Sequence, residues 1–149
     1  MKLTKRITGL RTNAFAAVVG LLIEFVLGTT LYGQVPKDAH GRGLFGALGE
    51  VLISGPVLLI LHAIVGTLIV VSAATAVVRA ILFRNPGFIA LMSVAFLAVL
   101  LAWIAGSAFA NTLAPTAARA MEWSTAVALL LYAIILFVRT PQSAKAAEQ

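Results

Sequence analysis

One stretch of the sequence constrains the fold more than any other, the segment 54–83, SGPVLLILHAIVGTLIVVSAATAVVRAILF. It is almost wholly apolar and longer than the run of about 20 residues that a helix needs to cross a bilayer. One ionisable residue, His62, lies well inside it, with Gly66 one turn later. Because an ionisable side chain is costly to bury in a membrane, such a residue usually marks a functional site. We therefore expect a membrane bundle built around this helix.

Similar apolar runs recur along the chain of 149 residues, of which 61% are hydrophobic and 11% are charged. Soluble domains usually carry about 25% charged residues. Long apolar runs predict membrane helices, which satisfy their backbone hydrogen bonds internally, whereas a β-barrel needs alternating segments of about ten residues. The chain has no cysteine. This excludes disulfides, thiolate metal sites and a cysteine nucleophile.

The pattern predicts an all-α fold, a polytopic up-and-down bundle of four transmembrane helices that forms one domain over residues 1–149. We expect the helices at about 12–32, 56–82, 88–110 and 120–138. In the first loop, apolar residues recur at three- and four-residue spacing over 44–52, which predicts a short interfacial helix. Pro86 and Pro115 lie in the later connections, where we expect them to interrupt the helices.

The net charge of +6 reflects basic residues at the ends of the spans rather than a basic patch. This pattern indicates membrane topology and not nucleic-acid binding. Of the eleven Lys and Arg residues, eight fall at the N-terminus, the 79–84 connection and the C-terminus, and three fall in the other two loops. We expect both termini to be cytoplasmic. The first apolar run is longer than that of a signal peptide, so we expect it to be retained as a helix.

Two ionisable residues lie inside the predicted spans, Glu24 in the first and His62 in the second. Each is seven residues from the outer end of its helix, which at 1.5 Å per residue places both about 10 Å below the outer surface. Ser107, Asn111 and Glu122 belong to the same outer half of the bundle. We predict that these five residues form a polar layer, open to the outside, that binds a ligand or a proton.

The Glu24–His62 pair has several interpretations. It is either a structural contact that clamps the first two predicted helices together or a proton-accepting site. Alternatively, His62 is an axial ligand of haem b, with Met121 as the sixth ligand. Metal binding by Glu24, His62 and Glu122 is a further alternative, although we expect no metal. The sequence has no nucleophile–base pattern, phosphate loop or metalloprotease motif, so we do not predict an enzyme.

The run EFVLGTTL at 24–31 resembles a segment of the small multidrug-resistance exporters. In that family, a membrane glutamate on the first helix exchanges protons for cationic drugs. The resemblance covers only this run, its spacing is off by one, and this chain adds His62 and a longer first loop. It implies a proton-coupled exporter that uses Glu24.

The whole chain is similar to the small four-helix membrane proteins common in high-GC bacteria. These proteins carry a glutamate on helix one, an LHxxxG-type segment on helix two (61–66 here) and a Gly-Ser or Gly-Ala step on helix three (106–107 here). The resemblance implies the fold and a bacterial inner membrane, but no activity.

The function that we predict is non-enzymatic and needs no cofactor. The chain is expected to be a small binding or accessory subunit of the inner membrane, as a homo-oligomer or within a larger membrane complex. Its binding layer is centred on Glu24 and His62. The alternatives are a b-type haem protein that transfers electrons through His62 and a proton-coupled small-molecule exporter that uses Glu24.

Overall fold

The structure is a computed structural model that describes residues 2–137. All its regular elements in this range are helical: α1 (Lys2–Thr30), the 3-10 helix η1 (Lys37–Ala39), α2 (Gly43–Ser54), α3 (Val57–Phe83), α4 (Pro86–Thr112) and α5 (Pro115–Phe137). Four of these helices are long and apolar enough to span a membrane. The predicted fold class, an all-α bundle of four spans, is confirmed, and α2 corresponds to the short helix expected over 44–52.

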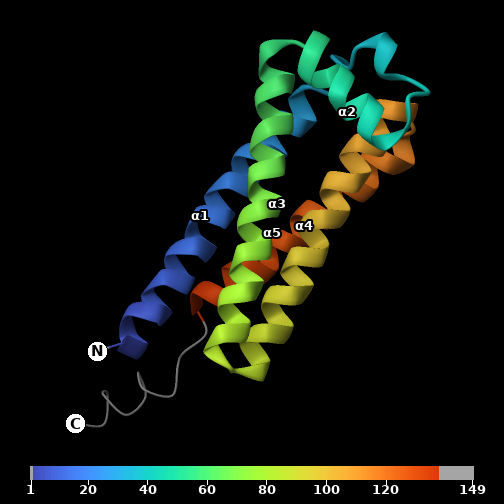
Figure 1. Cartoon of the computed structure of the whole chain (residues 1–149). Coiled ribbons are helices and arrows are strands. Elements are labelled where there is room, and N and C mark those ends of the chain that lie inside the picture. Colours follow the sequence, from blue (N-terminus) through green and yellow to red (C-terminus); the bar gives the residue numbers. More distant parts are fainter. Residues whose placement is uncertain (1, 138–149) are drawn as a thin grey trace.

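The four long helices form a ring in which α1 and α4 each pack against both α3 and α5. At the end where α3 meets α4, these two helices lie close together (Figure 1). Toward the other end α3 and α4 diverge, and α2 lies across this wider end (Figure 1). Contacts of α2 with both α3 and α4 bridge the two helices. The bundle is therefore closely packed at one end and covered by α2 at the other.

Several helix ends differ from those predicted. Helix α1 begins at Lys2 rather than at 12, since the polar N-terminal segment continues the helix beyond the apolar span. Helix α5 begins at Pro115, five residues earlier than expected. Proline is suited to the first turn of a helix because it has no N–H to satisfy there. The last residue predicted for this helix, Val138, and the tail that follows it lie outside the described residues.

The two tight connections have local causes. Arg84 and Leu113 adopt left-handed conformations (φ 56° and 52°) directly after α3 and α4, as residues that end helices often do. The side chain of Asn85 then caps α4, because its Oδ1 accepts hydrogen bonds from the N–H groups of Gly87 and Phe88 (3.1 and 3.3 Å). Pro86 is therefore the first residue of α4 and not part of a loop.

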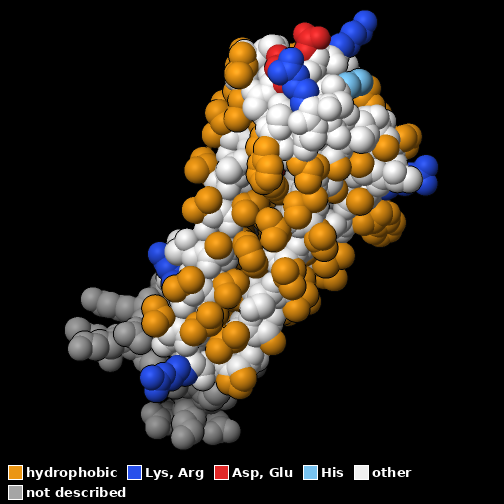
Figure 2. All heavy atoms as spheres, turned by 45° about the vertical axis from the view of Figure 1, so that its right-hand side comes forward, with side chains coloured by type: hydrophobic (Ala, Val, Ile, Leu, Met, Phe, Trp, Pro, Cys, Tyr) orange, Lys and Arg blue, Asp and Glu red, His pale blue; other side chains and the backbone are white. Residues whose placement is uncertain are grey.

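Buried apolar residues form two clusters. The larger cluster fills the closely packed part of the bundle and is rich in alanine, with Met92, Tyr132 and Ile135 as its largest fully buried side chains. The smaller cluster lies under α2 and joins it to the neighbouring ends of α3 and α4 and to the residues that follow α1. Outside these clusters, large hydrophobic side chains cover the long helices, while acidic side chains lie only at the α2 end of the face in Figure 2. An apolar exterior of this kind suits contact with lipid.

Candidate functional site

The structure brings Glu24 of α1 and His62 of α3 into direct contact. His62 Nδ1 lies 2.6 Å from Glu24 Oε2, and the two side chains are only 21% and 8% exposed. The atoms are as close as in a charge-assisted pair, although the contact lacks the directed angle of a hydrogen bond. The contact links two neighbouring helices of the ring and lies inside both predicted spans.

Glycines make room for this pair. A Cβ atom on Gly66 would lie 3.3 Å from Glu24 Oε2, and one on Gly28 would lie 3.4 Å from His62 Cε1. Gly106 is related to Met121 in the same way, because a Cβ atom there would lie 3.2 Å from the sulfur. The small residues that allow close helix packing in membranes thus face the side chains of this site.

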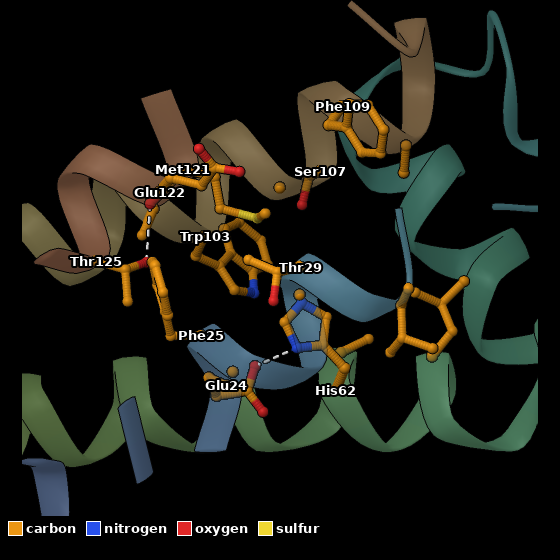
Figure 3. Close-up of a pocket in the computed structure, with 18 of the residues that line it drawn as sticks. Glu24, Phe25, Thr29, His62, Trp103, Ser107, Phe109, Met121, Glu122 and Thr125 are labelled. Carbon is orange, nitrogen blue, oxygen red and sulfur yellow. Dashed lines mark hydrogen bonds and ion pairs between the residues drawn. The ribbon is translucent and has the colours of Figure 1, made fainter. Parts of the chain in front are cut away.

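A cavity of about 130 Å³ adjoins the pair and is lined by residues of all five α-helices. Figure 3 shows side chains from the four long helices converging on this space, with the second ring nitrogen of His62, Nε2, directed into it. Four aromatic side chains line the cavity: Phe25, Tyr32, Trp103 and Phe109. Its wall is thus mostly apolar, with a few polar groups at defined places.

The polar groups of the cavity differ in how they are satisfied. Trp103 Nε1 donates to Thr67 Oγ1 (3.0 Å), and Thr125 Oγ1 donates to the backbone oxygen of Met121 (2.8 Å). Glu24 Oε1, by contrast, is buried and has no hydrogen-bond partner within residues 2–137. It is therefore a buried acceptor without a donor, on a residue that lines the cavity.

Four of the five predicted site residues line this cavity: Glu24, His62, Ser107 and Glu122. Ser107 is buried, and Glu122 is half-buried. The fifth, Asn111, is not among the lining residues. Its Oδ1 accepts from the N–H of Gly43 (2.9 Å), and its backbone oxygen accepts from the N–H of Gly41 (3.1 Å). Asn111 thus fastens the start of α2 to the end of α4.

Sequence reasoning did not identify Phe25, Thr29, Trp103 or Thr125 as lining residues. The spacing carried a partial signal, since Phe25 and Thr29 lie one and five positions after Glu24, and Thr125 lies one turn beyond Met121. The predicted layer was expected to open to the outside. In the structure, Leu48 and Val51 of α2 form part of the lining on that side.

The metal and haem alternatives have different geometric support. Among residues 2–137, no three His, Asp or Glu residues lie close enough together to hold a metal ion, so Glu24, His62 and Glu122 do not form such a site. The two proposed haem ligands approach the same glycine, because His62 Nε2 and Met121 Cε lie 3.7 and 3.5 Å from the position of a Cβ on Gly28. The cavity, however, is much smaller than a haem macrocycle.

Comparison with known proteins gave no match to a protein-family model, to a curated protein or to a solved structure.

Proposed function

We propose that this chain is a non-enzymatic, small-molecule-binding protein of the membrane, and that the cavity beside Glu24 and His62 is its binding site. One observation carries the proposal: Glu24 lines the cavity, and its buried Oε1 has no hydrogen-bond partner among the described residues. Leaving a buried acceptor unsatisfied costs about 1–3 kcal/mol, and more for a charged group. A ligand that donates a hydrogen bond there removes this cost when it binds.

The size of the cavity limits the ligand. An engineered apolar cavity of about 150 Å³ in another protein binds benzene, and the present cavity of about 130 Å³ is slightly smaller. The bound part of the ligand is therefore about as large as a six-membered ring. An accessory role in a larger membrane complex, or as a homo-oligomer, is compatible with this proposal.

The proposed location is a bacterial inner membrane with cytoplasmic termini. Support comes from the excess of Lys and Arg on one side, eight against three. In this orientation α2 and the cavity lie in the outer half of the bundle, since the beginning of α1 and the α3–α4 connection lie at the opposite end (Figure 1).

A methionine provides the test of ligand binding. Met121 lines the cavity, whereas Met92 is fully buried in the larger apolar cluster. Purified protein labelled with ¹³C at the methionine methyl groups is titrated with a panel of ring-sized alcohols, amines and acids. We expect at least one compound to shift the Met121 signal saturably while the Met92 signal stays in place.

A filled cavity provides the matched control. Leucine at Gly28 would extend past His62 and Met121 into the cavity, whereas alanine at Gly20 would contact only Ile69. Gly28→Leu is therefore expected to abolish the shift and Gly20→Ala to preserve it. The proposal is wrong if no compound shifts Met121, or if Gly28→Leu binds as well as the natural chain.

The b-type haem function remains a second candidate, because His62 and Met121 both approach Gly28. It requires the helices to separate around the macrocycle. An absorption spectrum of the purified protein after addition of haem tests it directly, since bound haem gives a Soret band that His62→Ala should remove. The exporter alternative also remains a prediction. Its test is transport by reconstituted protein, which should be lost in Glu24→Gln.

A further inference from the structure

The cavity is closed on the side that faces away from the bilayer centre. The smaller apolar cluster, which contains Leu31, Val51 and Leu59, packs beneath α2 at this end. The ring of Phe45 on α2 also contacts that of Trp103, with centroids 6.2 Å apart. Access through this end therefore requires α2 to separate from the bundle.

The cavity reaches the molecular surface elsewhere. Only three of its lining residues are exposed, and all three belong to one stripe of α1 and the residues directly after it, at spacings of four and three: Phe25, Thr29 and Tyr32. Phe25 and Thr29 lie within the span Arg11–Thr30. The Thr29 hydroxyl donates to the backbone oxygen of Val26 (3.0 Å), so this stripe offers no unsatisfied hydroxyl to lipid.

We infer that the ligand enters sideways from the bilayer, past Phe25 and Thr29, and that it is a lipid-soluble molecule with a hydroxyl-bearing ring, of the class of long-chain phenols and hydroquinones. This inference rests on the proposed function, because it specifies the ligand of the same cavity. The ring occupies the cavity, and the alkyl chain extends through the opening into lipid.

Three properties of the cavity select this class. Its volume of about 130 Å³ suits one ring, and the aromatic side chains of its wall offer the edge-to-face contacts that rings favour. Glu24 lines the cavity, and its Oε1 is an acceptor without a partner among the described residues, so a ring hydroxyl can supply the missing donor. A neutral hydroxyl also crosses an apolar opening at much lower cost than a charged group.

The test compares two lipid-soluble probes with the same ring and alkyl chain, of which one has a hydrogen-bond donor and the other has none. The full chain, labelled at its methionine methyl groups, is placed in phosphatidylcholine nanodiscs and titrated with 4-nonylphenol or with 4-nonylanisole, whose methyl ether cannot donate. We expect 4-nonylphenol to shift Met121 saturably and 4-nonylanisole to bind about tenfold or more weakly, the factor that the loss of one hydrogen bond to a charged group produces.

Two matched pairs of variants locate the acceptor and the opening. Glu24→Gln is expected to reduce the difference between the two probes, whereas Glu50→Gln, on the α2 surface and paired with Arg42, should not. Thr29→Trp should slow or block binding of 4-nonylphenol. Thr30→Trp should not, because Thr30 is exposed on the same helix but does not line the cavity.

The outcomes separate this inference from the proposed function. Equal binding of both probes overturns the ring-hydroxyl assignment, and an unchanged rate in Thr29→Trp overturns the lateral opening. If water-soluble ring compounds shift Met121 while 4-nonylphenol does not, the inference is wrong and the proposed binding function survives. If neither group of compounds shifts Met121, both are wrong.

Discussion

At the scale of single residues, the site depends on contacts between polar side chains and glycines. Glu24 lies against Gly66, His62 against Gly28, and Met121 against Gly106. Each glycine removes a Cβ atom at the point where a larger residue would displace the functional side chain. A glycine in a membrane helix therefore has two interpretations, as a helix-packing position or as space for a neighbouring side chain, and here the second applies at three positions.

The pairing of Glu24 with His62 predicts a non-additive effect on stability. His62→Ala leaves the buried carboxylate without its neighbour, and we expect the free energy of unfolding to fall by about 1–3 kcal/mol. Glu24→Leu combined with His62→Ala removes the orphaned group, so the double variant should lose less than the sum of the two single variants. Unfolding in mixed micelles of SDS and a mild detergent measures all three.

The coupling free energy between Glu24 and His62 can be compared with values for other polar pairs in membranes. Polar pairs within membrane helices couple by about 0.6 kcal/mol on average and by at most about 1.7 kcal/mol. As a control, Glu50→Gln breaks the contact of Glu50 with the exposed side chain of Arg42 (3.1 Å), which is expected to cost about 1 kcal/mol. Strict additivity of the Glu24 and His62 replacements would show that the two side chains do not interact.

At the scale of elements, hydrogen bonds fix helix α2, which covers the wider end of the bundle, at both of its ends. At its end, Gly55 donates to the backbone oxygen of Val51 (3.0 Å), and a Cβ atom at Gly55 would overlap this oxygen. Gly49, in the middle of the same helix, has open space at its Cβ position. A side chain is therefore excluded at Gly55, directly after α2, but has room at Gly49 within it.

This contrast predicts opposite effects of the same substitution. Gly55→Ala forces the corner between α2 and α3 to move, and we expect it to destabilise the protein by about 1–3 kcal/mol. Gly49→Ala is expected to stabilise it by about 0.5–1 kcal/mol, because alanine favours a helix over glycine by that amount. Thermal unfolding of the two variants in the same detergent gives the comparison. Similar effects of the two replacements would contradict the conclusion that the connection between α2 and α3 requires glycine at position 55.

At its beginning, α2 depends on the Asn111 side chain, which accepts from the N–H of Gly43. We expect Asn111→Ala to increase amide hydrogen exchange over 41–47 and to cost about 1 kcal/mol, as the loss of one such hydrogen bond does. The environment of Glu24 and His62 should not change, because Asn111 is not among the residues that line their cavity. If the His62 ring signals change while hydrogen exchange in α2 does not, the result would contradict this role and would support the prediction that Asn111 belongs to the binding site.

The four spans could be predicted from the sequence because length and hydropathy decide them. That Glu24 and His62 lie at a common level could also be predicted from residue counts, and the structure brings the two together. The helix ends could not be predicted in the same way, since a proline such as Pro115 is compatible with both a loop and the first turn of a helix. Asn111 shows a similar ambiguity, because a polar residue at a helix end either faces a cavity or caps the neighbouring backbone.

At the scale of the whole molecule, the two ends of the bundle differ in packing and in charge. The end opposite α2 is closely packed and rich in alanine, and the α2 end contains the cavity. The excess of Lys and Arg lies on the side of the closely packed end. By the positive-inside rule, this charge pattern predicts that the cavity lies in the outer half of the membrane.

This orientation can be tested with introduced cysteines, since the natural chain contains none and gives no background. Gln34 is exposed in the connection that follows α1, and Arg84 is exposed between α3 and α4. We expect Gln34→Cys to react with a membrane-impermeant maleimide in intact cells and Arg84→Cys to react only after permeabilisation, because basic residues remain on the cytoplasmic side. Ala98→Cys, buried within α4, should not react in either case. The reversed pattern would place the Glu24–His62 cavity in the cytoplasmic half.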